Sequence, residues 1–229
     1  MAKRIIFLPN LDMQNALYRE ELVDFDWVPG MAISQAKKSV RNLHTVAKEQ
    51  LGISRILEIS TRSELELGLS LSAFNLSILH ENRMTSVESL YQSSKVFQNG
   101  GPFTDLISAS SMHAKQDPRL KDSGSLTGFY FKGQAWPLTT SPNFYDYLYI
   151  SALLSNKMHL AIADFQAFSD IAFSQSSIKY KKGKSYNCQA RSAAICLTLM
   201  NNLEDSAILE ALGNFTVDSA PQTEQLGLF

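Results

Sequence analysis

The sequence predicts a mainly α fold with a minor β component, and three observations lead to this prediction. Apolar residues recur at helical spacing in long segments, among them 35–51, 144–154 and 187–200. Runs with β-type character are fewer and shorter, such as 4–8 and 54–60. No repeat, low-complexity stretch or obvious linker divides the 229 residues, so we expect a single domain. Within it we distinguish an N-terminal elaboration, a core and a tail, at 1–60, 61–215 and 216–229.

Charge and hydropathy exclude several classes of protein. The net charge is −1, so the molecule has no overall positive field that would attract nucleic acid. Any such contact needs a local patch, and the best candidate is the basic run with Lys179, Lys181, Lys182 and Lys184. This run fits a solvated loop and a phosphate-binding loop equally well. No apolar segment approaches the ~20 residues that span a bilayer, so we expect a soluble, cytoplasmic protein without membrane contact.

Cysteine and histidine usage gives no sign of a metal or redox centre. Cys188 and Cys196 lie eight residues apart in one expected helix, so roughly 12 Å of axial rise separates them. That separation is too large for a disulfide. The four histidines are scattered without the spacing of metal ligands. We therefore expect no metal and no other cofactor.

The N-terminal half begins with a short strand and continues with two helices. Ser34 and Gly52 mark the ends of the first helix, and Ser63 with Glu66 forms a capping box for the second. In order, the expected elements are a strand over 4–8, a loop or short strand within 11–31, a helix over 35–51, a strand over 54–60, a helix over 63–71 and a turn over 72–76.

The C-terminal half contains most of the expected helices and one hairpin. Lys132-Gly133 marks the hairpin turn, and Asn143 caps a strongly apolar helix. In order, the expected elements are a central helix over 86–97, a helix starting at 103–107, strands over 126–131 and 134–138, helices over 144–154 and 158–165, an extended run over 168–173, and helices over 187–200 and 204–212. We expect the tail after Asp218 to be disordered.

The central helix carries a stripe of polar side chains. At about 100° per residue, Glu88, Gln92 and Lys95 lie on one face and Tyr91 flanks them. A carboxylate, an amide, an amine and a phenol then point to one region of space, as in an acid–base site. The same pattern is typical of the solvated face of an ordinary amphipathic helix, which is the more common case.

Other candidate residues also have two interpretations. Asp170 lies in an apolar run, where a carboxylate is costly to bury and is kept either for hydrogen bonding or for function. Trp136 fits a ligand-stacking residue or, more usually, a hairpin core position. Asn187 and Gln189 fit a helix cap or ligand contacts. The common phosphate-binding, dinucleotide, serine-hydrolase and zinc-protease motifs do not occur in the sequence.

Several of these segments together resemble the NADAR family, the NAD- and ADP-ribose-associated proteins. Thr85-Ser-Val-Glu-Ser-Leu-Tyr-Gln-Ser-Ser-Lys-Val-Phe97 is similar to the Val-Glu…Gln…Lys helix of the family. The remaining similar segments are Gly30–Gln35, Ser72–Asn75, Trp136–Leu138, Phe144–Ile150, Phe168–Phe173 and Asn187–Ser192. The resemblance covers about residues 27–200 and is strongest to the branch paired with DarT-type DNA ADP-ribosyltransferase toxins. One departure is Ala172, where the family pattern Asp-Ile-Glu-Phe-Asn-Pro has a glutamate.

The resemblance implies a NADAR-like single domain and an N-glycosidase that removes ADP-ribose from guanine bases in DNA. Such an enzyme acts as the antitoxin of a DarT-type toxin and releases ADP-ribose. The implied catalytic residues are Glu88, Lys95 and Asp170. The implied ligand-binding residues are Phe74, Asn75, Tyr91, Gln92, Trp136, Asn187 and Gln189. The four lysines of the basic run become the candidate contacts to nucleic acid.

Two other functions remain open at this point. NADAR relatives are also thought to hydrolyse N-glycosidic bonds of small metabolites, such as a riboflavin-pathway intermediate. The departure at Ala172 is compatible with a non-catalytic protein that binds ADP-ribose or sequesters the toxin. The basic run and the N-terminal elaboration favour the DNA-directed enzyme, because an enzyme for a small metabolite needs neither.

Overall fold

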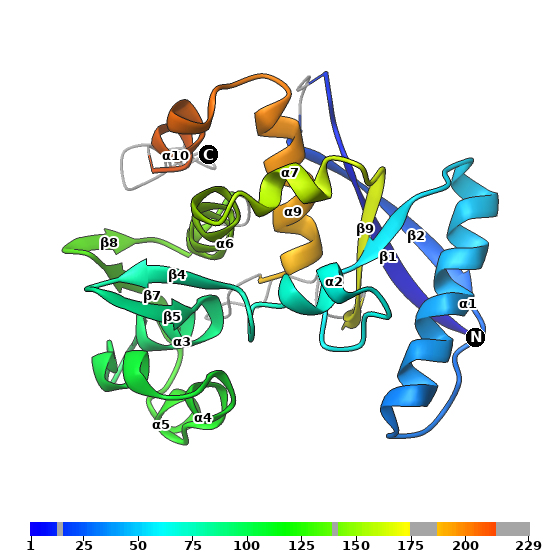
Figure 1. The fold of residues 1–229 in the computed structure, drawn as a ribbon. Helices are drawn as coiled ribbons and strands as arrows, with labels where there is room; N and C mark the ends of the chain where they lie inside the picture. Colours follow the sequence, from blue (N-terminus) through cyan, green and yellow to red (C-terminus); the bar gives the residue numbers. More distant parts are fainter. Residues whose placement is uncertain (13–15, 139–141, 175–186, 214–229) are drawn as a thin grey trace, which may run out of the picture.

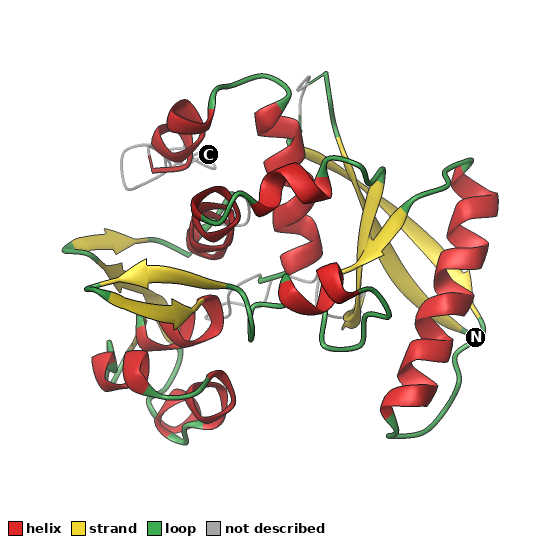
Figure 2. Ribbon diagram, viewed as in Figure 1, coloured by secondary structure: helices red, strands yellow, loops and turns green. Residues whose placement is uncertain are grey.

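The computed structural model describes residues 1–12, 16–138, 142–174 and 187–213. Of these residues 43% are helical and 24% lie in strands, which form three sheets. The fold is therefore mixed α/β, and the prediction of a mainly α fold with a minor β component is wrong (Figure 2). Strands of three or four residues account for much of the difference, since they are too short to show alternation in a sequence.

The largest sheet pairs strands that lie far apart in the sequence. It has the order β2-β1-β9-β3, in which β9 is antiparallel to β1 and parallel to β3. Its strands are β1 (Ala2–Pro9), β2 (Tyr18–Phe25), β3 (Ile56–Glu58) and β9 (Ala167–Ser174). In β1, Ile5 and Phe7 face one hydrophobic core while Ile6 and Leu8 face a second. Both faces of this sheet are thus covered.

Helices lie on both sides of this sheet (Figure 1). Helix α1 (Ile33–Leu51) buries Val40, Leu43 and Ala47 in the smaller core. On the other side lies α9 (Gln189–Met200), whose side chains from Gln189 to Leu199 are all buried. Next to α9 are α6 (Phe144–Ser155), α7 (Met158–Ile162) and α10 (Asp205–Gly213). No helix in the described ranges is long and apolar enough to span a membrane.

A buried ion pair joins α6 to α9. Arg191 Nη2 lies 3.0 and 2.9 Å from the two carboxylate oxygens of Asp146, and both side chains are fully buried. Asn143 caps α6 as predicted, and Asp146 completes a capping box with it. The Asp146 carboxylate therefore fixes the first turn of α6 against α9.

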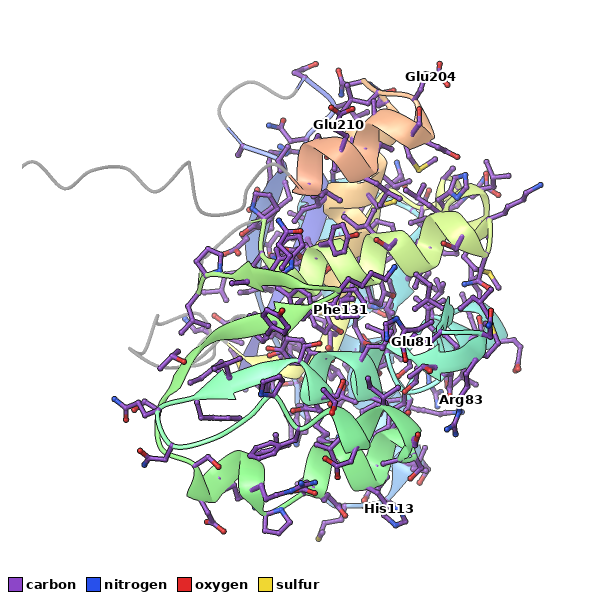
Figure 3. The ribbon with its side chains drawn as sticks, turned by 90° about the vertical axis from the view of Figure 1, so that its left-hand side faces the viewer. Glu81, Arg83, His113, Phe131, Glu204 and Glu210 are labelled. Atoms are coloured by element: carbon purple, nitrogen blue, oxygen red, sulfur yellow. The ribbon has the colours of Figure 1, made fainter. Side chains whose placement is uncertain are left out.

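The rest of the chain forms two small sheets and several short helices. Strands β4 (Ser77–His80) and β5 (Arg83–Ser86) form one hairpin, and β6 (Lys95–Phe97), β7 (Leu126–Phe131) and β8 (Gln134–Trp136) form a three-stranded sheet. The short helices are α2 (Glu66–Ser70), α3 (Val87–Ser93), η1 (Thr104–Ser108), α4 (Ser111–Gln116) and α5 (Arg119–Asp122). Phe131 of β7 is buried, whereas Glu81, Arg83 and His113 are exposed (Figure 3).

Several predicted elements are confirmed, and others change their ends. The first helix, the hairpin 126–138, the helix after Asn143 and the helix before Met200 are all present. The first helix begins after Ala32, so Ser34 lies inside it. Ser63 does not cap α2, because α2 starts after Leu65 and the Ser63 hydroxyl accepts from the Leu65 N–H instead. Residues 11–31 contain a full strand, β2.

The central helix is shorter than predicted. Helix α3 ends at Ser93, and Lys95 begins β6, where it pairs with Phe129 of β7. The predicted helical position of Lys95 is therefore wrong, because pairing with a strand some thirty residues away replaces the last helical turn. The division at residues 60 and 215 stays a prediction, and the tail 216–229 lies outside the described residues.

Candidate active site

A cavity of about 280 Å³ lies where β3, β9 and α9 approach α3, α4 and α6. Two acids, Glu88 and Asp170, line it together with two cationic side chains, Arg62 and Lys115. The other lining residues are Ser60, Thr61, Ser72, Phe74, Met112, Tyr145, Ala172, Asn187 and Gln189. Segments far apart in the sequence thus contribute one polar cavity beside the main core.

Glu88 reaches the cavity from the first turn of α3. Ser86 caps this helix by accepting from the Ser89 N–H at 3.1 Å, and Glu88 itself is 2% exposed. Gln92 Nε2 donates to Glu88 Oε1 at 2.8 Å, and Lys115 Nζ lies 3.6 Å from the same oxygen. An amide and an ammonium group therefore hold the carboxylate in place and balance its charge.

Asp170 reaches the cavity from β9. Its Oδ1 accepts from the Ala172 N–H at 3.0 Å, and its Oδ2 accepts from Gln189 Nε2 at 3.3 Å. Burial raises the pKa of Asp170 to about 6, although Arg62, Lys115 and these hydrogen bonds favour the charged form. Near neutral pH a fraction of Asp170 then carries a proton, as a general acid needs.

The cations are placed beside the acids. Lys115 Nζ lies 4.8 Å from the centre of the Phe74 ring, in addition to its contact with Glu88. Arg62 follows β3, and its N–H donates to the Ser60 hydroxyl at 3.0 Å. The cavity therefore presents charged side chains of both signs.

The comparison with protein families decides which group of proteins this is. The family described as DarT1-associated NADAR antitoxin matches residues 2–222. The chain belongs to this family. As a NADAR antitoxin it is paired with a DarT1 toxin, and the NADAR family is generally associated with N-glycosidase activity. No curated protein matches the chain in a sequence search.

Lys95 of this NADAR antitoxin does not line the cavity within the described residues. Its Nζ lies 4.7 Å from the centre of the Tyr91 ring, and Tyr91 packs edge-on against Tyr145, which does line the cavity. Burial lowers the pKa of Lys95 to about 8, although the nearby Glu88 charge favours the ammonium form. A fraction of neutral amine therefore exists at neutral pH, close to the carboxylate of Glu88.

Three other predicted ligand contacts lie away from the cavity. Tyr91 is buried in the core, 1% exposed. Trp136 packs against Phe144 and Tyr147, at centroid distances of 5.3 and 4.7 Å, which is the hairpin core position. Asn75 is exposed and its Nδ2 donates to the Leu69 carbonyl, so it closes the turn after α2.

Gln92, Gln189, Asn187 and Phe74 lie at or directly behind the cavity wall. Gln92 contacts Glu88 and is otherwise buried, so its place is behind the carboxylate. Gln189 accepts from the Ala73 N–H at 2.8 Å and donates to the Ile59 carbonyl at 2.6 Å as well as to Asp170. Asn187 and Phe74 line the cavity directly. Ala172, where the family pattern has a glutamate, also lines the cavity.

The sequence interpretation missed Arg62, Lys115 and a buried acid, Glu58. Arg62 and Lys115 lie in polar segments without any distinguishing pattern. Glu58 lies in the apolar run Ile56–Ile59, and the criterion that selected Asp170, an acid between apolar residues, would have selected it too. The four lysines of the basic run lie outside the described residues.

Proposed function

We propose that this NADAR antitoxin removes ADP-ribose from guanine bases in DNA by hydrolysing the bond between the sugar C1″ and the base nitrogen. The observation that carries the proposal is the presence of Glu88 and Asp170 in one cavity, in a chain whose family is paired with a DarT1 toxin. A pair of acids in different environments is the arrangement that cleavage of a glycosidic bond requires.

The surroundings of the two acids support different roles. Glu88, in contact with Lys115 and Gln92, stabilises the positive charge that develops on the sugar as the bond breaks. Asp170, with its pKa raised to about 6, donates a proton to the leaving guanine. Water then adds to C1″ and gives a proton to the Asp170 carboxylate, which completes the hydrolysis and restores the acid.

Lys95 participates through its position beside Glu88. Its pKa of about 8 leaves two routes, a direct attack of the neutral amine on C1″ or an electrostatic effect on Glu88. Arg62 and Lys115 are the side chains best placed to bind the diphosphate of ADP-ribose, because both are cationic and both line the cavity.

The direct test is incubation with an ADP-ribosylated guanine oligonucleotide, followed by detection of free ADP-ribose and of unmodified guanine. We expect both products from the unaltered protein. Binding of ADP-ribose without release would instead indicate a non-catalytic module. Release from a small N-glycoside of a metabolite, with none from the oligonucleotide, would indicate a metabolic enzyme.

A further inference from the structure

Strand β9 is irregular at the point where it carries Asp170. Ile6 of β1 pairs with Ser169, whereas Arg4, two residues earlier, pairs with Ser174. Two steps along β1 therefore correspond to five along β9, and the additional residues form a bulge from 170 to 173. Bulges re-aim side chains and occur frequently next to active sites. Here the bulge turns Asp170 into the cavity.

The peptide groups of Ile171 lie at the centre of this bulge, and two side chains hold them in place. The Ile171 N–H donates to Glu58 Oε1 at 2.9 Å, and the Ile171 carbonyl accepts from Arg4 Nε at 2.7 Å. Backbone groups in a bulge lose their partners in the strand ladder, so an outside donor and acceptor are needed. Glu58 and Arg4 supply them from β3 and β1.

Glu58 is fixed in the orientation that this contact requires. Its Oε1 also accepts from the Ser60 hydroxyl at 2.6 Å, and its Oε2 accepts from the Ser169 hydroxyl. Ser169 in turn lies 2.8 Å from His44 Nε2 of α1. Glu58 is 2% exposed and lines a second cavity beside His44, not the one that contains Glu88 and Asp170. Contact with a substrate in the proposed site is therefore not its role.

We propose that Glu58 is a positioning residue for Asp170: its carboxylate holds the bulge of β9 and places a second acid behind the Asp170 carboxyl. This inference rests on the proposed function of Asp170 as the acid of the reaction. It assigns a role to a side chain that does not touch the substrate. Glu58 lies 112 residues before Asp170 and shares no sequence motif with it.

Electrostatics agree with this geometry. Burial and the Asp170 charge raise the pKa of Glu58 to about 7, and burial raises that of Asp170 to about 6. Two buried acids that repel each other share protons and titrate as a pair. Other groups that act on Asp170 are Arg62 and Lys115, and those that sense its charge include Arg4 of β1, Tyr145 of α6 and Cys188 before α9.

The substitution Glu58→Gln distinguishes the effect of the Glu58 charge from the effect of its hydrogen bond to the bulge. The amide keeps an oxygen that accepts from the Ile171 N–H, while the negative charge behind Asp170 is lost. Without the carboxyl of Glu58, Asp170 no longer shares protons with a second buried acid. We expect the part of the pH–rate profile that belongs to the pair to change from two ionisation steps to one. Glu58→Ala also removes the acceptor, and turnover should fall on the order of 10- to 100-fold through misplacement of Asp170.

The matched control is Glu64→Gln, the same change at an exposed acid that lies outside the candidate active site. Its pH–rate profile should coincide with that of the unaltered protein. A profile for Glu58→Gln that is lower at every pH but keeps the two ionisation steps of the unaltered protein would show a merely structural role and overturn the inference.

A second measurement needs neither substrate nor a Glu58 variant. In protein labelled with ¹³C at the aspartate carboxyls, the Asp170 signal is assigned by its loss in Asp170→Asn. We expect it to titrate in two steps, because the ionisation of Glu58 changes the shift of Asp170. A single step at the ordinary aspartate pKa would contradict the proposal, even if Glu58→Gln fails to fold. Two steps in a protein that releases no ADP-ribose would refute the proposed function and leave the pairing of Glu58 with Asp170 intact.

Discussion

The Glu88 carboxylate has an ammonium group 3.6 Å away and an amide at 2.8 Å, whereas Asp170 is held by a backbone N–H and a side-chain amide. Both side chains line the same cavity. At the residue scale, and under the proposed function, these different neighbours, rather than the residue types, assign charge stabilisation to Glu88 and proton donation to Asp170.

Lys95 gives a prediction at this scale. We expect Lys95→Ala to lower turnover by at least about 100-fold, the range of an acid–base or nucleophilic contribution, while the protein stays folded. Turnover of ADP-ribosylated oligonucleotide and a thermal melt measure the two effects. If the amine attacks C1″ while Asp170 protonates the base, the rate should be highest between about pH 6 and 8 and fall above that range, because it needs both neutral Lys95 and protonated Asp170.

Borohydride added during turnover distinguishes the two routes for Lys95. A reduced ADP-ribose adduct on Lys95 would establish an imine, and its absence would leave the electrostatic route. Activity that survives Lys95→Ala undiminished, with no adduct, would remove this lysine from the mechanism altogether.

The sequence shows which acids lie between apolar residues, but not which side chains lie near them in the fold. Asp170 stands out in Phe168–Phe173 because burial of a carboxylate is costly, and it does line the cavity. Lys115 and Arg62 could not be selected, since a lysine or arginine in a polar segment is the normal case. For Trp136 the residue type alone does not decide the role. A tryptophan suits stacking on a ligand, but tertiary packing places this one in the core.

At the scale of elements, Gln189 connects three segments that form the cavity. Its amide accepts from Ala73 and donates to Ile59 and Asp170. We expect Gln189→Ala to lower the free energy of unfolding by about 2–3 kcal/mol, because buried backbone groups lose their partners. Turnover should fall as well, since Asp170 loses a hydrogen bond. Urea unfolding measures the first effect.

Gln134→Ala, at an exposed glutamine of β8, is the control for that substitution. We expect it to change the free energy of unfolding by less than about 0.5 kcal/mol. Equal effects of the two substitutions would show that the buried amide of Gln189 does not connect the segments as described.

The boundary between α3 and β6 illustrates what periodicity cannot predict. Glu88 and Gln92 are one turn apart and do contact each other, as the helical spacing predicts. Lys95 fits the same spacing, but it pairs with Phe129 in a sheet. That pairing depends on a strand distant in the sequence, and local patterns contain no information about such a partner. By contrast, Asn143 and Gly52 mark helix ends through local chemistry, and both predictions are confirmed.

At the scale of the whole molecule, the main sheet pairs strands from distant parts of the chain. Strand β1 pairs with β9, more than 160 residues later, and the bulge in β9 lies at this junction. The mixed α/β fold could not be predicted because such pairing has no local signal and because five of the strands have only three or four residues.

The basic run gives a prediction about DNA. Reversing the charges of Lys179, Lys181, Lys182 and Lys184 should weaken action on ADP-ribosylated oligonucleotides and leave action on an ADP-ribosylated nucleoside nearly unchanged. The reason is that only the oligonucleotide has a DNA backbone whose phosphates these lysines would contact. The defect should shrink as the salt concentration rises, because each contact contributes to the salt dependence of binding.

Reversal of Lys3, Lys38, Lys48 and Lys121, which are exposed outside this run, provides the control of equal charge. If both quadruple variants lose oligonucleotide activity equally, the effect comes from net charge and the basic run is not a specific contact.

The central claim is that protection from the toxin is catalytic and depends on the carboxylate of Glu88. The most direct measurement is growth of cells that produce the DarT1 toxin together with either the unaltered antitoxin or Glu88→Gln, with matched protein levels and thermal melts. The substitution keeps the shape of the side chain and removes its charge. We predict that Glu88→Gln stays folded, fails to restore growth and leaves ADP-ribosylated guanine in the DNA. Full protection by Glu88→Gln would contradict the account and identify the protein as a partner that neutralises the toxin by binding.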